Sequence, residues 1–321
     1  MAVPANTVQR VTRVGVREDL NNTISILARE DFPFMSNIGT GTASNTYFEW
    51  QTDALAAADP NNAVIDGDDV GNDAVPPTTR LGNYVQTMDK TFGLSHITQQ
   101  VNHAGNHTTP GAQLAKKARE LKRDMETRLG GNYAAVPPAA GTAHQTAGAV
   151  AFTRTNASRG AGGAASTLSG GTSGYVNAAP TNGALRTVTE AMLKSALQLA
   201  WDAGGEPSIA LMSGTIKQTF STFTGIAQQR RETGSKAATI VGAADVYVSD
   251  FGDISFVPSR FTTGRDVLIA DPSMWEVLYL QRFNTTDLAK TGHSDRKMLA
   301  VEFALKCKNE LGNAVIADVQ P

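Results

Sequence analysis

Apolar residues recur at three- and four-residue intervals between Pro110 and Leu129, the spacing of a helix that buries one face. The stripe consists of Leu114, Ala118, Leu121, Met125 and Leu129. Thr108 or Thr109 can cap the first turn, and Gly130-Gly131 ends the pattern. This is the clearest helix that the sequence predicts.

Two opposite-charge pairs lie four residues apart on this helix, Lys122 with Glu126 and Asp124 with Arg128. Each pair would contribute only ~0.2–0.5 kcal/mol. We therefore expect the apolar stripe, and not the charges, to decide how the helix packs.

Two strand-like runs precede the helix. Tyr47, Phe48 and Trp50 form the first run, and the second extends from Tyr84 to Ile97. The segment Asp53 to Arg80 between them is rich in Ala, Asp, Asn, Gly and Pro. The pattern predicts a long hairpin over residues 46–101 that needs a partner surface, because an isolated hairpin is marginally stable in water. Residues 1–45, with short apolar pieces and turn formers, are predicted to be an arm.

Residues 134–186, after the helix, are rich in Gly, Ala, Ser and Thr, with few large apolar residues. Such a composition offers little apolar area to offset the entropy of ordering. The sequence therefore predicts a long, flexible surface insertion here.

The remaining chain shows the pattern of a compact α+β unit. A capping-box spacing at Thr187 to Glu190 opens a helix whose expected buried stripe is Val188, Met192, Ala196 and Leu199. Further predicted elements are a strand at 208–212, a helix at 215–223, a hairpin formed by 246–249 and 254–257, an alternating strand at 299–307, and a final return over 314–319.

The charge balance argues against a general affinity for nucleic acid. The chain of 321 residues has 28 Lys and Arg against 30 Asp and Glu, so its formal charge is −2. Its 41% hydrophobic residues suffice for one large domain or two smaller ones. Cys307 is the only cysteine, which excludes an intrachain disulfide and four-cysteine zinc sites. The N-terminus carries no secretion pattern, and no stretch is apolar enough to span a bilayer, so a soluble protein is expected.

Each partial match to a metal-binding or catalytic motif lacks a residue that the motif requires. The run beginning at Asp66 starts like a calcium loop, but Val70 and Pro77 replace two ligands. His103 and His107 are four apart without a glutamate after His103. We expect no metal, no cofactor and no catalytic site.

Two glycine pairs and one triplet also mimic functional motifs. The runs at Gly39 and Gly160 begin like dinucleotide fingerprints but lack the third glycine. Asp250-Phe251-Gly252 copies a kinase triplet without its companion motifs and is better explained as a hairpin turn. An enzyme is therefore the least favoured of the function classes.

The order of elements resembles the Hong Kong-type capsid fold of tailed bacteriophages, and particular runs resemble the podovirus-type branch of their major capsid, or major head, proteins. These runs span most of the chain: Arg17-Glu18-Asp19-Leu20, Asp31-Phe32-Pro33-Phe34, Tyr47-Phe48-Glu49-Trp50-Gln51-Thr52-Asp53, Glu120-Leu121-Lys122-Arg123-Asp124-Met125-Glu126 and Leu288-Ala289-Lys290-Thr291-Gly292. The resemblance implies an α+β fold divided into an N-arm (1–45), an extended E-loop (46–101), a spine helix of the peripheral domain (102–133), the insertion (134–186), an axial domain (187–285) and C-terminal strands returning to the peripheral domain (286–321).

The resemblance also implies a structural function. The subunit would self-assemble as hexamers and pentamers into a procapsid that matures into an icosahedral virion shell around double-stranded DNA, held on the inner face without sequence specificity. A separate scaffold protein, a portal protein and possibly a decoration or cement protein would be partners, no membrane would be involved, and synthesis would occur in the host bacterial cytoplasm. The alternative is an encapsulin-like bacterial compartment shell, which shares the fold.

Opposite charges on two predicted elements provide candidate contacts between subunits. The hairpin tip is acidic, whereas the helix is rich in Lys and Arg. The candidates are Asp66, Asp68 and Asp69 on the hairpin, and Lys116, Lys117, Arg119, Lys122 and Arg123 on the helix. One interpretation is that both are ordinary solvated surfaces, since an exposed ion pair contributes only ~0–1 kcal/mol. The sharper hypothesis, which the resemblance supports, is that the hairpin of one subunit lies over the helix of its neighbour, with an assembly rate that falls as salt rises.

Overall fold

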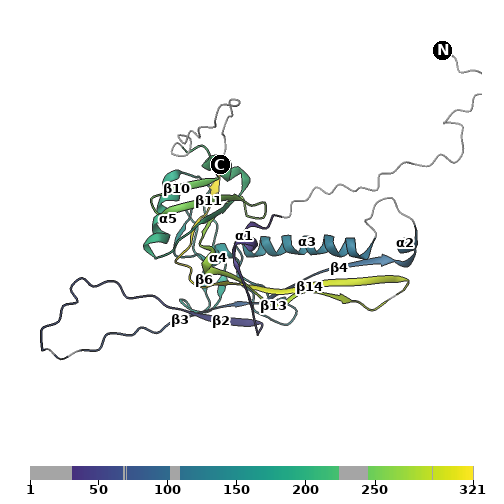
Figure 1. The fold of residues 1–321 in the computed structure, drawn as a ribbon, viewed down its shortest axis with the longest axis horizontal. Helices are drawn as coiled ribbons and strands as arrows, with labels where there is room; N and C mark the ends of the chain where they lie inside the picture. The colour runs from purple at the N-terminus through teal and green to yellow at the C-terminus, as the bar shows by residue number, and fades with distance from the viewer. Residues whose placement is uncertain are drawn as a thin grey trace, which may run out of the picture.

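The computed structural model describes residues 31–67, 69, 71–101, 109–223, 245–290 and 292–320. Within these ranges the chain forms two main sheets, one of four strands and one of six, joined by a continuous set of buried apolar side chains. A long hairpin projects from one end of the molecule, and the elongated four-stranded sheet with its helix extends in the opposite direction (Figure 1). The arrangement is α+β, as predicted.

The four-stranded sheet has the order β1-β13-β14-β4. Its longest strands are β13 (Trp275–Asp287) and β14 (Ser294–Cys307), which pair antiparallel. Strand β1 (Gly39–Thr42) joins β13 in parallel, and β4 (Gln86–Ser95) pairs antiparallel with β14. The alternation predicted for 299–307 is thus a real strand, which buries Leu299, Val301 and Phe303.

Helix α3 (Pro110–Leu129) lies along this sheet against β4 and β14 (Figure 1). Thr109 caps it by accepting a hydrogen bond from Ala112 N, and Gly130 follows its last residue. Leu121, Met125 and Leu129 are fully buried, which confirms the predicted stripe at its C-terminal half. Leu114 and Ala118 are only half-buried, so the helix packs progressively more deeply towards Leu129.

The six-stranded sheet has the order β10-β11-β9-β12-β15-β5. Its strands are β9 (Ile209–Met212), β10 (Val246–Ser249), β11 (Gly252–Pro258), β12 (Val267–Ala270), β15 (Ala314–Ile316) and the short β5 (Ala157–Ser158). Helices α5 (Glu190–Asp202) and α6 (Gly214–Phe220) pack on it and close a second core. The predicted hairpin of β10 and β11 is confirmed, with Asp250 and Phe251 at its turn.

The predicted stripe of α5 is partly confirmed, because Val188 and Ala196 are buried and Met192 packs against the core, but Leu199 does not belong to the buried face. Leu193, Ala196, Leu197 and Ala200 are buried, whereas Leu199 is exposed. Thr189, and not Thr187, caps the helix by accepting from Met192 N, so the helix starts later than the capping-box spacing implied.

The predicted hairpin of residues 46–101 is shorter than expected. Only β2 (Tyr47–Thr52) and β3 (Thr79–Tyr84) pair with each other. The second apolar run continues as β4 in the four-stranded sheet, and Ile97 lies exposed in the short helix α2 (His96–Gln100). One apolar run thus serves two sheets, because the chain changes partner at Val85, which is fully buried.

The expectation of a surface insertion at 134–186 is wrong for much of that segment. Helix α4 (Ala149–Phe152) is entirely buried, as are Leu168 and Val176. The segment also forms the small ladders of β6 (Thr167–Leu168) with β7 (Val176–Ala178), while β8 (Arg186–Thr187) pairs with β16 (Val319–Gln320). Neighbouring elements, chiefly the two sheets, supply the core that the segment cannot make alone.

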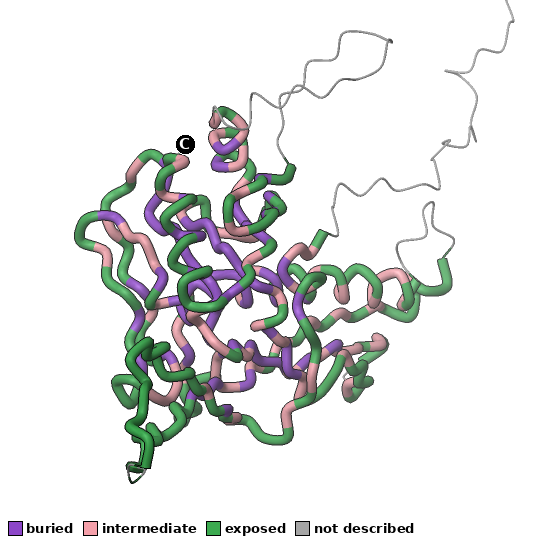
Figure 2. The backbone as a smooth tube through the Cα atoms, turned by 60° about the vertical axis from the view of Figure 1, so that its left-hand side comes forward, coloured by how far each residue is buried: buried purple, intermediate pink, exposed green. Residues whose placement is uncertain are grey.

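The boundary predicted at residue 285 is also wrong. The chain leaves the six-stranded sheet after β12, passes through the short 3-10 helix η2 (Pro272–Met274), and enters the four-stranded sheet at Trp275. It returns to the six-stranded sheet at β15, so the last residues do not all belong with β13 and β14. Figure 2 shows the buried residues concentrated in the middle of the body of the molecule, with exposed residues around them. Among the described residues, no helix is both long and apolar enough to cross a membrane.

Candidate assembly surfaces

The tip of the hairpin is exposed along its whole described length. Every described residue from 53 to 80 is solvent-exposed, and none of those between 53 and 78 belongs to a strand. Four large apolar side chains on it are between 78% and 99% exposed: Leu55, Val64, Ile65 and Val75. Nothing in the described chain covers them, so the tip is a candidate contact surface.

The base of the hairpin, in contrast, is held firmly. Tyr47 and Tyr84 face each other across β2 and β3 with ring centroids 4.7 Å apart, and Tyr175 packs edge-on against Tyr84 at 5.1 Å. Burial and the neighbouring Glu49 raise the pKa of Tyr47 to about 12, so its hydroxyl stays protonated. Gly174 N donates to Arg80 O and accepts, through its carbonyl, from Gly82 N. The glycine-rich segment thus fixes the root of the hairpin.

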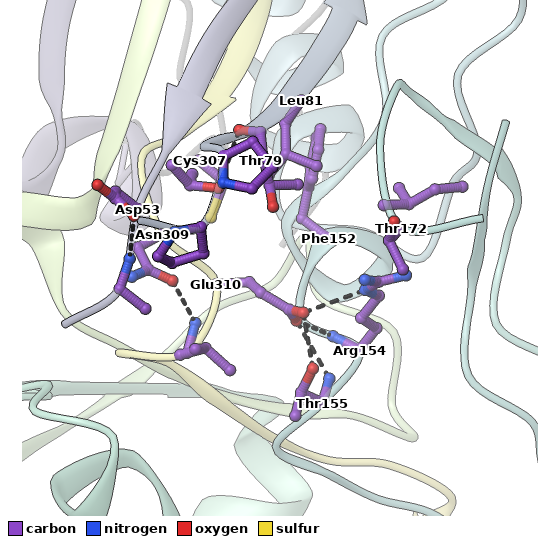
Figure 3. A pocket seen from close by; sticks show the side chains of 16 residues that line it. Asp53, Thr79, Leu81, Phe152, Arg154, Thr155, Thr172, Cys307, Asn309 and Glu310 are labelled. Carbon is purple, nitrogen blue, oxygen red and sulfur yellow. Dashed lines mark hydrogen bonds and ion pairs between the residues drawn. The ribbon is translucent and has the colours of Figure 1, made fainter. Parts of the chain in front are cut away.

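A cavity of about 420 Å³ lies beside this root (Figure 3). Its floor is apolar and includes Leu81, Phe152 and Cys307, while Arg154 and Glu310 form part of its rim. Burial raises the pKa of the Cys307 thiol well above its usual value, so this cysteine is unreactive packing.

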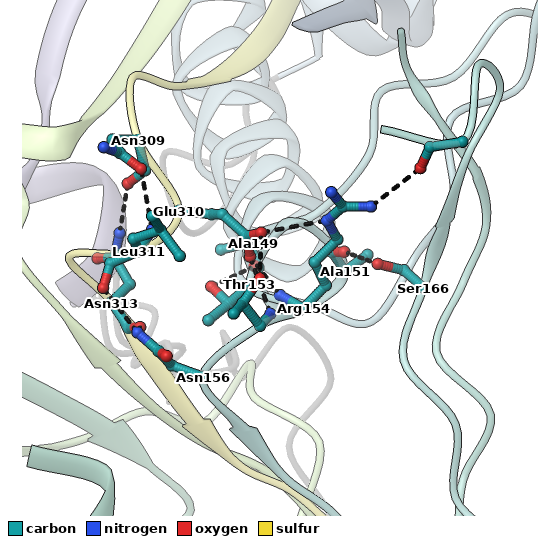
Figure 4. A network of polar contacts seen from close by, with 12 residues as sticks. Ala149, Ala151, Thr153, Arg154, Asn156, Ser166, Asn309, Glu310, Leu311 and Asn313 are labelled. Carbon is teal, nitrogen blue, oxygen red and sulfur yellow. Dashed lines mark hydrogen bonds and ion pairs between the residues drawn. The ribbon is translucent and has the colours of Figure 1, made fainter. Parts of the chain in front are cut away.

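The carboxylate of Glu310 organises the rim. It accepts hydrogen bonds from Arg154 N, Arg154 Nε, Thr155 N and Thr155 Oγ1, at 2.7–3.1 Å (Figure 4). Asn313 in the same turn accepts from Trp275 Nε1 at 2.8 Å. These contacts join the turn after β14 to the segment that follows α4, which makes the network structural.

The basic candidates on α3 have different environments. Lys116, Arg119, Lys122 and Arg123 are exposed, whereas Lys117 is half-buried and donates to Glu120 Oε2 at 2.8 Å. Lys122 lies over the Phe283 ring and Arg123 over the Phe261 ring, at 5.9 and 5.7 Å from the centroids. The acidic tip and the basic helix lie on opposite sides of the same chain (Figure 1).

The structure therefore does not bring Asp66 and Asp69 near these basic residues within one subunit. Asp68 lies outside the described residues. Any contact between the two groups has to join different copies of the chain, since the hairpin extends away from α3.

The two charge pairs predicted within α3 are not formed. Asp124 accepts from Lys90 Nζ at 2.7 Å, and Arg128 donates to the carbonyls of Thr146 and Ala134. Burial lowers the pKa of Arg128 to about 10. Both side chains serve tertiary contacts, which the spacing within the helix could not reveal.

Glu126 is an element of the site that the sequence analysis missed. It is only 2% exposed, and its carboxylate accepts from Phe34 N at 2.7 Å and Met35 N at 3.0 Å. These are the first N–H groups of the short helix α1 (Pro33–Asn37). Phe34 also packs edge-on against Trp275 at 5.9 Å. The contact anchors the N-terminal segment to α3, and its only trace in the sequence is the position of Glu126 beside the apolar stripe.

A second exposed apolar surface lies on the six-stranded sheet. A cavity of about 660 Å³ separates α5 from β10, which is the edge strand of the described sheet. Trp201 stacks on Phe251 at 5.3 Å and is still 53% exposed, and Val246 and Val248 are exposed beside it. These side chains also lack cover in a single subunit.

The described residues contain no group of three or more His, Cys, Asp or Glu side chains arranged to hold a metal ion. His103 and His107 lie outside the described residues. Asp66 and Asp69 lie in an exposed loop, and Asp250 to Gly252 lies at the β10–β11 turn.

Comparison with known proteins decides the family. The SU10 major capsid protein family matches residues 3–320. The chain belongs to this family. A segment of 115 residues is 36% identical to the major capsid protein of Escherichia phage Phieco32, which corresponds to 36% of this chain and 33% of that relative, so the alignment spans about a third of the relative's length.

Solved structures show that the fold is that of the Hong Kong-type capsid proteins. The capsid asymmetric unit of cyanophage A-1(L) superposes with a TM-score of 0.69 at 12% identity, covering 98% of this chain and 100% of that chain. The holo-SrpI encapsulin complex of Synechococcus elongatus has a lower TM-score of 0.53 at 11% identity, covering 94% and 92%. Family and fold together are those of a capsid-shell subunit, which is a structural protein class.

Proposed function

We propose that this chain is the major capsid subunit of a tailed bacteriophage and assembles as hexamers and pentamers into an icosahedral head. The observation that carries this proposal is the exposed hairpin tip, which presents apolar side chains that only another molecule can cover. The family and the fold support the same function. The repeated partner is then a second copy of the chain, and the protein resides in the virion capsid.

The segments of the fold take corresponding roles in this proposal, with boundaries revised by the structure. The E-loop is the hairpin of β2 and β3, and the spine helix is α3. The peripheral domain combines α3 with β1, β4, β13 and β14, while the axial domain contains the six-stranded sheet. Residues before α1 would form the N-arm, anchored to the spine helix through Glu126.

The direct test is negative-stain electron microscopy of the purified chain. Shells, tubes or hexameric rings are the expected particles. A chain that stays monomeric at high concentration, and also in the presence of a copurified scaffold protein, would contradict the proposal.

Contact between the hairpin tip and the neighbouring subunit can rest on charge, on apolar burial, or on both. Exposed ion pairs contribute only ~0–1 kcal/mol each, so the aspartates act mainly on register and on the rate of association. Burial of four apolar side chains contributes more, at ~25 cal/mol per Å² of apolar surface. We therefore propose that Val64 and Ile65 hold the contact while Asp66, Asp68 and Asp69 orient it.

Two sets of variants separate these contributions when assembly is followed by light scattering across a salt series. The Debye length shrinks from ~10 Å at 0.1 M salt to ~3 Å at 1 M. The triple variant Asp66→Asn, Asp68→Asn, Asp69→Asn should assemble more slowly and lose most of the salt dependence. Val64→Ser with Ile65→Ser should reduce the final amount of assembled protein at every salt concentration.

The matched control for this series is the triple variant Asp202→Asn, Asp250→Asn, Asp253→Asn, which removes three exposed acidic charges from the six-stranded-sheet unit and leaves the hairpin intact. It should leave the salt dependence of the rate largely unchanged. An unchanged rate and salt slope in the hairpin triple variant would refute the orienting role of its aspartates.

Further partners belong to the same proposal: a separate scaffold protein, a portal protein, possibly a decoration or cement protein, and packaged double-stranded DNA on the inner face. Assembly would begin as a procapsid in the cytoplasm of the host bacterium. An encapsulin-like compartment is the second candidate, because that fold superposes as well. Nuclease-protected DNA in purified particles favours the phage head, whereas a copurified cargo enzyme favours the compartment.

A further inference from the structure

Two histidines face each other at the end of the β4–β14 pair that lies farthest from the hairpin tip (Figure 1). His96 directly follows β4, and His293 directly precedes β14. Their neighbours Ser95 and Ser294 are paired in register, and His96 N donates to His293 O at 3.1 Å. The two imidazole rings are tilted by 47° with centroids 4.6 Å apart. The sheet itself therefore fixes the two rings side by side.

The surroundings of this pair are polar. Both histidines are exposed. Gln100 Nε2 lies 3.4 Å from His96 Nε2, and Asp295 lies nearby, with its Oδ1 accepting from Lys290 Nζ at 2.6 Å and its Oδ2 accepting from Gln99 Nε2 at 3.2 Å. The carboxylate is thus already occupied by a lysine and an amide, whereas the imidazoles make only weak polar contacts.

We propose that His96 and His293 together bind a divalent transition-metal ion, with Zn²⁺ as the representative ion. Neutral imidazole nitrogens suit Zn²⁺, Cu²⁺ and Ni²⁺. Two nitrogens on one tetrahedral Zn²⁺, each at ~2.0–2.1 Å, are ~3.3 Å apart. Rings whose centroids are 4.6 Å apart reach this separation by rotation of two exposed side chains, and the backbone does not need to move.

Among the described residues, His96 and His293 are the only ligands at this site, since no third His, Cys, Asp or Glu completes a cluster with them. Water fills the other positions. Both rings have to be neutral to coordinate, so protons compete with the metal for the imidazole nitrogens. A metal held across β4 and β14 binds the folded chain in preference to the unfolded chain, and it should therefore stabilise this end of the sheet.

The test is isothermal titration of ZnCl₂ into the full, metal-stripped chain at neutral to slightly alkaline pH, where metal binding meets little competition from protons. One saturable site per chain is expected. His96→Gln and His293→Gln should each weaken zinc binding at least tenfold. Two controls, His144→Gln and the double variant His103→Gln with His107→Gln, should bind as the unmodified chain does.

A second readout guards against a variant that is simply misfolded. Zn²⁺ should raise the melting temperature of the unmodified chain, whereas Mg²⁺ should not. The zinc effect should vanish in His96→Gln and His293→Gln. Without metal, both variants should have the melting temperature of the unmodified chain. Absence of saturable binding, or equal zinc affinity in both variants and the unmodified chain, overturns the proposal. The measurement uses unassembled protein, so its outcome is independent of the capsid function.

Discussion

Glu126 illustrates how a single buried carboxylate connects distant parts of this chain. Its two hydrogen bonds come from backbone N–H groups 91 and 92 residues earlier in the sequence. Burial raises the pKa of the carboxyl, and the hydrogen bonds from Met35 and Phe34 only partly oppose that effect. Burial therefore destabilises the charged form of Glu126, while its hydrogen bonds hold α1 in a defined position.

The raised pKa gives a pH dependence of known sign. Between the ordinary pKa and the raised folded value, the folded chain holds more protons on Glu126 than the unfolded chain does, so this group's contribution to stability falls as pH rises. Glu126→Gln removes that contribution. In urea unfolding of the unassembled chain from about pH 4 to 8, the difference in unfolding free energy between variant and unmodified protein should shift in favour of the variant as pH rises.

Glu302→Gln, on β14, serves as the control for a general loss of one negative charge. If both variants differ from the unmodified chain by the same amount at every pH, the pH dependence does not come from Glu126.

Glycine at position 148 permits a close approach of two backbone segments. A Cβ added there would overlap the carbonyl oxygen of Gly131, which is a backbone atom and cannot move aside as a flexible side chain does. Gly148→Ala should therefore cost ~1–3 kcal/mol of unfolding free energy, the range for overpacking. Gly111→Ala is the matched control, since nothing lies within 4 Å of its added Cβ on helix α3.

Chemical denaturation of the two variants provides the comparison. Gly111→Ala should be neutral or stabilising by up to ~1 kcal/mol, because alanine is the better helix former. Equal effects of the two substitutions would show that the chain around residue 148 is not tightly packed.

At the scale of elements, periodicity predicted those segments that bury one regular face. Helix α3, the β10–β11 hairpin and strand β14 all appear where the sequence placed them. The stripe on α5 was only partly right: Val188 and Ala196 are buried, but Leu193, Leu197 and Ala200 complete the buried face in place of Leu199. Periodicity in the sequence therefore predicts whether a segment is a helix or a strand more reliably than it predicts which residues of that helix are buried.

The segment 134–186 shows why composition misled the analysis. Small residues predict disorder when they are considered alone, since they bury little apolar area. Here they allow close backbone contacts instead, as where Gly160 and Gly183 approach each other and Ala184. The partners of these contacts are distant in sequence, so no local pattern indicates them. For the same reason the roles of Glu126 and Glu310 could not be predicted from the sequence, because their hydrogen-bond partners lie 91–156 residues away.

The buried face of α3 permits a prediction for the element as a whole. Leu121 is fully buried and in the deep half of the helix, so Leu121→Ala should reduce the unfolding free energy by ~2–5 kcal/mol. Leu114 lies two helical turns earlier on the same face and is only half-buried, so Leu114→Ala should reduce the unfolding free energy clearly less. Urea denaturation of both variants measures the difference, and an equal or larger loss for Leu114→Ala would contradict the observed tilt of the helix towards the core.

On the scale of the whole molecule, the chain combines a well-anchored body with an uncovered projection. The root of the hairpin is fixed by aromatic contacts and by the glycine-rich segment, whereas its tip exposes Leu55, Val64, Ile65 and Val75. The resemblance of the sequence to capsid proteins led to the right fold and family, but it could not separate β4 from the hairpin. That distinction depends on the pairing of β4 with β14, more than 200 residues later.

The contrast between root and tip predicts a change in protease sensitivity on assembly. Thermolysin cleaves before large apolar residues and therefore has several sites on the tip, where the exposed backbone can enter an active site readily. In the unassembled chain the first cuts should fall between residues 53 and 78, and cleavage at the buried Leu121 should follow only on global unfolding. In assembled shells the tip should be cut at least tenfold more slowly, because a neighbouring subunit covers it.

Mass spectrometry of timed digests locates the cuts, and the solvent-facing residue Leu199 on α5 serves as an internal reference. Equal rates of tip cleavage before and after assembly would show that the apolar side chains stay uncovered in the shell, and the hairpin would then have no role in joining subunits.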